Sequence, residues 1–260
     1  MSYYERYNNN KKDNLDVNEK QDENKTNNPY EIQVKKTNKE GLEQPQSVEL
    51  DIFPKLPAGI LVVGRSGSGK TMAIVNMMTN PALLGDYFDI VYLFTDAKPD
   101  KELIKDLKLE KKYVITDFDE KKVLEIMDKA ERTVEQKGFK NSPKIMFLFD
   151  DILSNPKFLR SKTATKLATA NRHFNISYIF ASQYFKKLPN VLRTNSRYYM
   201  IFPSSMNETE KMADELTPPR MDKKKFIKYL DHATKERYSF LTINTDSQEP
   251  LRRKFENILI

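Results

Sequence analysis

The stretch GRSGSGKT has the residue types and the spacing to bind the phosphates of a nucleotide. It holds three of the seven glycines of the 260-residue chain within six positions. Glycine lets successive backbone N–H groups turn toward an anion, and the Gly-Lys-Thr ending fits the P-loop spacing. The expected contacts to ATP come from Gly64, Arg65, Ser66, Gly67, Ser68, Gly69, Lys70 and Thr71. A tight structural turn is the alternative interpretation of the same glycines.

The last two residues of this motif have separate expected roles. Lys70 is expected to reach the β- and γ-phosphates, and the Thr71 hydroxyl to ligate Mg²⁺. The preceding run, Gly59–Val63, is typical of a short buried strand, and apolar residues at helical spacing follow the motif. A strand before the loop and a helix after it form the setting that a P-loop requires. ATP and Mg²⁺ are therefore the predicted cofactors.

Two adjacent carboxylates follow the apolar run Ile145–Phe149. Open α/β sheets bind ligands at the carboxyl ends of their strands, so these acids are expected on a strand neighbouring the P-loop strand. Asp150 is expected to hold Mg²⁺ through its water shell. Asp151 is expected to orient or deprotonate the attacking water, with a helix N-cap as its alternative role.

A polar amide ends the next apolar run, Ile176–Gln183. At the end of a strand beside the acids, Gln183 would lie near the γ-phosphate. It would then sense whether this phosphate is present and relay that to the segment that follows. An ordinary polar side chain in a loop is the equally simple alternative.

Apolar strand patterns alternate with helical patterns along most of the chain. The strand patterns cover 59–63, 89–96, 112–116, 144–151, 176–183 and 197–202, and the intervening helical patterns cover 72–80, 99–107, 119–136 and 159–172. This alternation requires crossover connections and a sheet covered on both faces. The predicted fold class is α/β, a P-loop NTPase three-layer sandwich with a mostly parallel central sheet.

The chain divides into two parts of different composition. Residues 1–45 are rich in Asn, Lys, Glu and Gln and poor in apolar residues, which predicts a disordered polar tail. Residues 46–260 are predicted to form the P-loop ATPase domain. Within this domain, residues 203–260 contain helical patterns at 207–216 and 222–233 and a late strand pattern at 236–244.

Composition excludes several kinds of site. There is no cysteine and there are only two histidines, which excludes disulfides, thiol chemistry and a His/Cys zinc site. No apolar run is long enough to span a bilayer, and the polar N-terminus has no signal-peptide pattern, so a reducing, cytosol-like compartment is expected. Residues 1–50 carry 8 basic and 10 acidic side chains, so the total of +7 leaves +9 on the remainder. This surplus fits an anionic partner but is also common in domains that bind no nucleic acid.

The motif order resembles a known family. GRSGSGKT, IMFLFDD, NRHFNISYIFASQ and LPNVLRTNSRYYMIF follow one another as in the poxvirus-type DNA-packaging ATPases of the FtsK–HerA group, which occur in large DNA viruses and virophages. The similarity covers residues 50–260. It implies an Mg-dependent ATPase that acts as a homo-oligomeric ring and drives double-stranded viral DNA into a preformed capsid. Capsid or portal-vertex proteins would be its partners, and the host-cell cytoplasm or the virion its location.

The resemblance also implies an arginine that acts on the γ-phosphate of a neighbouring subunit. Arg172, at the end of the helix after the acid strand, is the main candidate for this role in catalysis, with Arg193 and Arg197 as substitutes. A surface or helix-capping arginine is the alternative. Many members of the wider group have Glu where this chain has Asp151, which leaves open how the attacking water is activated.

Contacts to DNA are expected to be made with phosphates, without reading of the bases. Lys186 and Lys187, shortly after Gln183, are the predicted DNA-binding residues. The cluster Lys223–Lys225 fits a solvated helix face better. Tyr184 and Phe185 have the ring types to stack on a strand, although core packing is the simpler expectation.

Other functions remain as alternatives. Another FtsK–HerA-like DNA translocase or a helicase is the main one, and a P-loop kinase or a scaffold that only binds ATP is less favoured. A GTPase switch is disfavoured because no guanine-reading Asn/Thr-Lys-x-Asp motif follows the acid strand.

Overall fold

The computed structural model describes residues 52–96, 98–116 and 119–257. The predicted disordered tail, residues 1–45, and the start of the domain at residue 46 lie outside the described residues and stay predictions.

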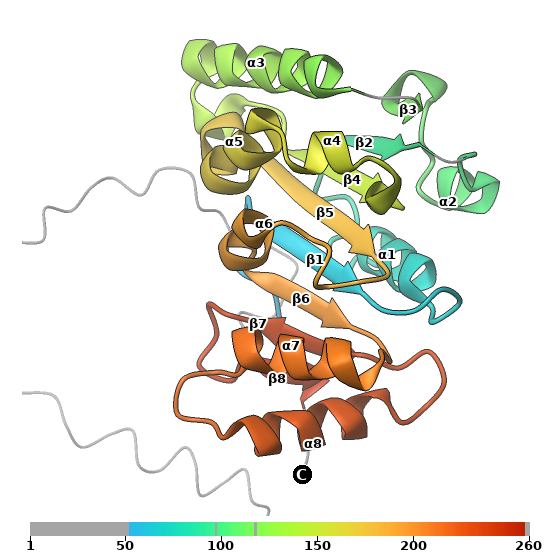
Figure 1. The fold of residues 1–260 in the computed structure, drawn as a ribbon. Helices are drawn as coiled ribbons and strands as arrows, with labels where there is room; N and C mark the ends of the chain where they lie inside the picture. Colours follow the sequence, from blue (N-terminus) through green and yellow to red (C-terminus); the bar gives the residue numbers. More distant parts are fainter. Residues whose placement is uncertain (1–51, 97, 117–118, 258–260) are drawn as a thin grey trace, which may run out of the picture. The chain divides into compact units, whose positions relative to one another are not determined.

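A nine-stranded sheet runs through the described part of the chain in the order β3-β2-β4-β5-β1-β6-β7-β8-β9 (Figure 1). The first six strands in the sequence are mutually parallel. They are β1 (Gly59–Val63), β2 (Ile90–Thr95), β3 (Val114–Thr116), β4 (Ile145–Asp150), β5 (Ile176–Ser182) and β6 (Tyr198–Ile201). The last three, β7 (Leu241–Asn244), β8 (Leu251–Arg253) and β9 (Glu256–Asn257), add on antiparallel. The mostly parallel α/β sheet predicted from the sequence is confirmed.

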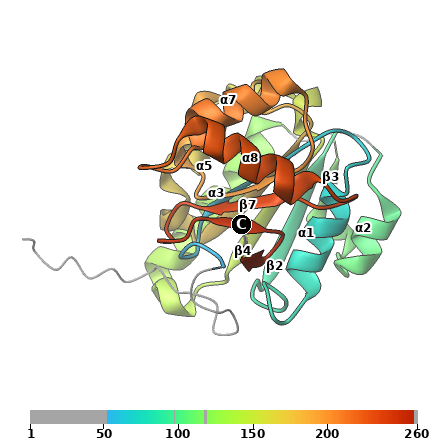
Figure 2. The same ribbon diagram turned by 90° about the horizontal axis from the view of Figure 1, so that it is seen from below.

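Helices cover both faces of this sheet (Figure 2). One face carries α1 (Lys70–Thr79) and α2 (Lys101–Asp106). The other face carries α3 (Glu120–Lys137), α4 (Pro156–Leu159), α5 (Lys162–Ala170), α6 (Asn190–Asn195), α7 (Met206–Leu216) and α8 (Lys223–Thr234). Because successive strand residues point to opposite faces, Leu61 and Val63 join one core while Ile60 and Val62 join the other. Burial on both faces is why these strands are continuous apolar runs in the sequence.

Stacked phenylalanines pack against one another in the sheet directly before the acid pair. The rings of Phe94 and Phe149 lie 4.7 Å apart, and those of Phe149 and Phe180 lie 4.4 Å apart, between centroids. All three side chains are fully buried. Offset aromatic contacts of this kind add to the stabilisation that burial already gives. The backbone that carries Asp150 is therefore held firmly from both sides.

Two sequence-based expectations about the elements were wrong in detail. The acid strand β4 is not next to β1, because β5 lies between them. The single helix expected over 159–172 is two helices and a 3₁₀ turn, Asn171–Phe174. The break arises because the Ser161 hydroxyl accepts a hydrogen bond from the Ala164 N–H at 3.1 Å and starts a new helix.

The sequence pattern also missed some elements. Helix α6 and strands β8 and β9 were not expected, because each is too short to show a clear period. The late strand pattern is confirmed as β7, although it begins at Leu241 and not at residue 236. Among the described helices, none is long and apolar enough to cross a membrane.

Candidate active site

The glycine-rich loop connects β1 directly to the first turn of α1. Gly69 precedes the helix with a φ of +100°, a left-handed conformation that glycine adopts without strain. Gly64 is closely packed, since a Cβ atom there would lie 2.3 Å from Cβ of Phe202. The glycines therefore do more than close a turn: they bring bare backbone to the N-terminus of a helix, which attracts anions.

Lys70 bridges this loop. Its Nζ donates hydrogen bonds to the carbonyl oxygens of Gly64, at 2.8 Å, and Arg65, at 2.9 Å. Burial lowers the pKa of Lys70, while the charges of Asp150 and Asp151 act to raise it. The ammonium group is thus held beside the acid pair, where it can be transferred from loop carbonyls to incoming phosphate oxygens.

The acid pair combines a buried and an exposed carboxylate. Burial raises the pKa of Asp150, and the nearby charge of Asp151 raises it further, against the opposing effects of Lys70 and of the Asp151 N–H. Asp151 is exposed and has a φ of +52°. The two helices that follow are capped by the side chains of Asn155 and Ser161. Asp151 therefore does not cap α4 or α5, and its role as the cap of the 3₁₀ turn Ile152–Ser154, which directly follows it, stays a prediction.

One cavity of about 460 Å³, called the phosphate cavity below after its expected ligand, lies at the carboxyl edge of the sheet and collects most of the expected groups. Its lining is Ser66, Gly67, Gly69, Lys70, Thr71, Met72, Asp150, Asp151, Ala181, Ser182, Gln183 and Tyr238. Three predicted contacts are not part of this lining. Gly64 is buried, the Ser68 hydroxyl oxygen is buried too, and the Arg65 guanidinium donates to the Ser204 carbonyl oxygen at 3.0 Å.

The strand order explains why Gln183 belongs to this cavity. Strand β5 separates the P-loop strand from the acid strand, so the residue after β5 lies between the loop and the carboxylates. Sequence analysis missed Met72 and Tyr238. No local signal marks Tyr238, because it is brought to the loop only by the packing of the C-terminal elements.

The lining offers a suitable set of oxygen donors for Mg²⁺. The Thr71 hydroxyl and the Asp150 carboxylate face the same cavity, and hard oxygen ligands are those that Mg²⁺ prefers. The described residues include no group of three or more His, Cys, Asp or Glu side chains that would hold a metal alone. A small donor set of this kind suits an ion that keeps several waters and binds nucleotide phosphates.

The segment after Gln183 is fixed to α7. The buried Glu208 carboxylate accepts hydrogen bonds from the N–H groups of Phe185, at 2.7 Å, and Lys186, at 3.1 Å. Phe185 is fully buried, which confirms its expected core packing, whereas Tyr184 is 43% exposed and does not pack in the core. The Lys187 Nζ lies 4.4 Å from the centre of the Tyr184 ring.

The two lysines of this segment differ from the basic cluster on α8. Lys186 and Lys187 are exposed and lie three and four positions after Gln183, and the Lys186 Nζ contacts the Asn207 side chain. In the cluster, Lys223 pairs with Asp214 at 2.5 Å and all three lysines are exposed. The cluster therefore has the features of an ordinary solvated helix face.

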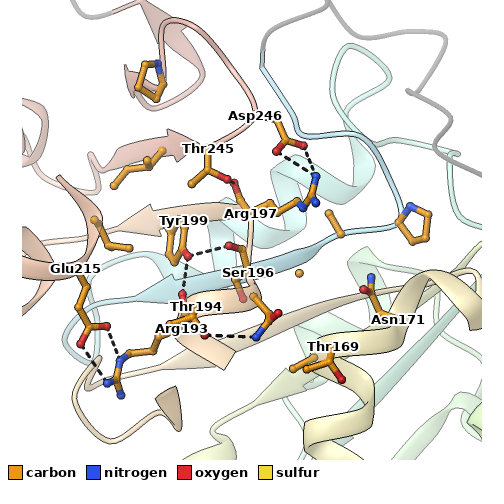
Figure 3. A pocket seen from close by; sticks show the side chains of 18 of the residues that line it. Thr169, Asn171, Arg193, Thr194, Ser196, Arg197, Tyr199, Glu215, Thr245 and Asp246 are labelled. Atoms are coloured by element: carbon orange, nitrogen blue, oxygen red, sulfur yellow. Dashed lines mark hydrogen bonds and ion pairs between the residues drawn. The ribbon is translucent and has the colours of Figure 1, made fainter. Parts of the chain in front are cut away.

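The candidate arginines lie at the opposite, amino edge of the sheet. They line a second cavity of about 980 Å³ that is formed around the start of β1 and β6 (Figure 3). Arg193 donates to both oxygens of Glu215, at 2.7 and 3.1 Å, and Arg197 donates to both oxygens of Asp246, at 2.9 and 3.1 Å (Figure 3). Arg172 is exposed and makes no side-chain hydrogen bond or ion pair within the described part of the chain.

The phosphate cavity and the arginines are thus separate within one subunit. Arg172, Arg193 and Arg197 are absent from the lining of the phosphate cavity. Of the three, Arg172 alone combines exposure with the absence of a carboxylate partner among the described residues.

Comparison with known proteins places this site in a family context. The Poxvirus A32 protein family matches residues 51–248, which is more than half of the chain. The DNA packaging protein OPG160 of variola virus is 25% identical over 169 residues, which cover 61% of this chain. The matched region spans 57% of that relative's own length.

Solved structures share the same fold. The genome packaging NTPase B204 of Sulfolobus turreted icosahedral virus 2, in complex with AMPPCP, superposes with a TM-score of 0.55 at 16% identity and covers 78% of this chain and 98% of its own. ATPases 2 and 3 of EssC from Geobacillus thermodenitrificans give a TM-score of 0.53 at 14% identity, over 76% of this chain and 39% of theirs. The match over residues 51–248 establishes that this chain belongs to the Poxvirus A32 protein family.

Proposed function

We propose that this protein is an Mg-dependent ATPase that moves double-stranded viral DNA into a capsid. The observation that carries the proposal is the cavity in which Lys70, Thr71, Asp150, Asp151 and Gln183 come together. The similarity to a protein named for DNA packaging supports DNA movement as the work that hydrolysis would drive.

In this proposal each group in the cavity has one task. Backbone N–H groups of the loop and the ammonium group of Lys70 bind the phosphate chain and neutralise its charge. Thr71 and Asp150 would hold Mg²⁺, whose chemistry when bound is to neutralise charge on the β- and γ-phosphates. Asp151 accepts a proton from the attacking water or orients it, and the Gln183 amide hydrogen-bonds near the γ-phosphate.

The amino-edge arginine points to action between subunits. Arg172 lies on the edge opposite the cavity that its own subunit offers to ATP. In a head-to-tail ring this edge would face the cavity of the next subunit, and Arg172 would neutralise charge on the γ-phosphate there. An arginine supplied in this way increases the rate of hydrolysis about 10³–10⁵-fold.

The same arrangement suggests how hydrolysis would reach DNA. Lys186 and Lys187 lie three and four positions after Gln183, so a change at the γ-phosphate would be passed to them through Tyr184 and Phe185. Their charge suits phosphate contacts that carry no base specificity. Capsid or portal-vertex proteins would receive the motor at an assembly site in the host-cell cytoplasm.

The test is the ATPase rate per subunit as a function of protein concentration, with and without double-stranded DNA, at low and moderate salt. A steep rise with concentration and stimulation by DNA are expected, because the site is completed between subunits. Lys70→Ala should abolish hydrolysis under every condition, whereas Lys223→Ala, on the solvated face of α8, should not. A rate that is independent of both concentration and DNA would instead indicate a monomeric kinase or a nucleotide-binding scaffold.

A further inference from the structure

Two large hydrophobic side chains are exposed in the cavity at the carboxyl edge of the sheet. The exposed large hydrophobic residues of the described chain are Met72 at 68%, Tyr184 at 43%, Met206 at 67% and Tyr238 at 51%. Met72 and Tyr238 both line the phosphate cavity. Exposed apolar groups at a concave site commonly mark the surface that an apolar part of a ligand covers.

Both side chains lie over the start of α1. A Cβ atom at Gly69 would be 3.1 Å from Cδ1 of Tyr238, so the ring rests against the loop backbone at that glycine. Met72 lies three residues further along, and residues three apart are neighbours on one helix face. The thioether and the ring are therefore close to the end of the helix that binds phosphate.

The turn that carries Tyr238 is anchored while its ring stays exposed. Tyr238 has a φ of +61° in the connection between α8 and β7. The Arg237 guanidinium lies 4.7 Å from the centre of the Tyr238 ring, and Glu236 forms an ion pair with Arg253 on β8. The Ser239 N–H donates to the Glu236 carbonyl oxygen at 3.1 Å. One face of the ring is thus supported by a cation and the turn is tied to the sheet.

The strand order sets the orientation that a bound nucleotide would take in the cavity. Asp150 ends β4 and Gln183 follows β5, which both lie on one side of β1. Tyr238 leads into β7, which lies on the other side of β1, beyond β6. A phosphate chain whose γ-end meets the acids and whose middle crosses the start of α1 therefore has its nucleoside end at Tyr238.

We propose that Met72 and Tyr238 form the slot that holds the nucleobase. The base stacks on the Tyr238 ring, whose other face is covered by Arg237, and contacts the Met72 thioether. This inference rests on the proposed ATP site. Because a ring face is recognised and not a pattern of hydrogen bonds, the slot contributes to affinity for any purine triphosphate. Loss of the stacking is worth about tenfold in affinity.

The experiment uses the lack of tryptophan in the natural chain. In Tyr238→Trp the indole is the sole tryptophan, and it is titrated with Mg-ATP and with Mg-tripolyphosphate, which has no base. Quenching by ATP without quenching by tripolyphosphate is expected, because the base alone stacks on the ring. In the control Tyr229→Trp neither titrant should quench, since Tyr229 has Lys225 over its ring at 5.6 Å but does not line the cavity.

Binding measured by calorimetry completes the test. Tyr238→Ala should bind Mg-ATP about tenfold more weakly than the natural protein and Mg-tripolyphosphate equally well. Met72→Ala, which keeps a good helix former on the surface, should show a smaller loss of the same kind and guards against misfolding of the tyrosine variant. Unchanged ATP affinity in both variants overturns the slot. Failure of the natural protein to bind either titrant overturns the ATP site itself.

Discussion

The charged side chains at the two edges of the sheet differ in how they are paired. At the carboxyl edge Lys70, Asp150 and Asp151 share one cavity. Burial lowers the pKa of Lys70 and raises the pKa of Asp150, which favours the neutral form of each side chain. At the amino edge Arg193 and Arg197 are bound by carboxylates of the same chain. Burial opposes ionisation of Glu215, yet hydrogen bonds from Arg193 and Lys211 hold its pKa below the ordinary value.

The carboxyl edge therefore has the charge arrangement of a binding site, whereas the charges of Arg193 and Arg197 at the amino edge are already paired within the chain. Charged groups that lack full pairing within the chain favour the binding of an incoming ion. Charged groups that are already paired mainly stabilise the structure. Arg172 is the exception at the amino edge, because it is exposed and has no charged partner in the described part. In the proposed ring it would act at the opposite edge of a neighbouring subunit.

The strongest challenge to this comparison is Arg172→Ala. We expect the ATPase rate of the pure variant to fall by about 10³–10⁵-fold while ATP binding persists. In mixtures with the natural protein, activity should fall more steeply than the fraction of variant, because each variant subunit inactivates a neighbouring site. A strictly proportional loss would remove the arginine from the subunit interface.

Arg197→Ala is the matched control from the same cavity. It removes the ion pair with Asp246 and should lower the melting temperature without dominating mixed assemblies. If Arg197→Ala instead suppresses mixed activity as Arg172→Ala is expected to do, the assignment of the two arginines must be exchanged.

At the carboxyl edge, Asp151→Asn should separate binding from chemistry. The variant keeps the size of the side chain but cannot accept a proton from water, so hydrolysis should fall by about 10²–10⁴-fold. Affinity for Mg-ATP, measured by calorimetry, should stay close to that of the natural protein. An active Asp151→Asn enzyme would show that water is activated elsewhere.

Lys186 and Lys187 are expected to make a smaller, salt-dependent contribution to DNA binding. Lys186→Ala combined with Lys187→Ala should reduce the slope of log affinity for double-stranded DNA against log salt by about 2, because each lysine is expected to neutralise one phosphate. The same double substitution at Lys224 and Lys225 is the control and should leave the slope unchanged. Equal effects of the two pairs would mean that charge alone, without location, governs binding.

The smallest expected effect concerns stability. Since burial raises the pKa of Asp150, the folded state binds more protons than the unfolded state between the ordinary and the raised pKa. Stability of the natural protein therefore falls as the pH rises through this window. Asp150→Asn should raise the melting temperature at neutral pH, without nucleotide or metal, and lose this advantage in acid below the ordinary Asp pKa.

Thermal unfolding at both pH values checks this, with exposed Asp231→Asn as the control that should change neither curve. A lower melting temperature for Asp150→Asn at neutral pH would show that the Asp150 carboxylate stabilises the fold, and the contrast between the two edges would then disappear.

Much of the carboxyl edge was predictable because its groups follow continuous apolar runs. A strand buried on both faces shows itself in the sequence, and the residue that ends it lies at the ligand-binding edge of the sheet. That logic placed Lys70, Asp150 and Gln183 in one site without any knowledge of the contacts. It failed for the neighbour of β1, because strand order depends on how crossover helices pack and leaves no local pattern.

The arginines at the amino edge show what could not be predicted from the sequence. Glu215 lies 22 positions from Arg193, and Asp246 lies 49 positions from Arg197. No local rule distinguishes these paired arginines from Arg172, which follows a helix in the same kind of polar context. Their difference follows from α7 and the segment after β7, which supply the carboxylates.

The sequence by itself determined the glycine-rich loop, the alternation of strands and helices and the carboxylates at a strand end, because each depends on the order of neighbouring residues. Only the tertiary structure decided that β5 lies between loop and acids, that Met72 and Tyr238 face the same cavity, and that Arg172 stays unpaired among the described residues on the far edge. These properties depend on residues brought together from distant parts of the chain, and packing of the whole sheet sets them.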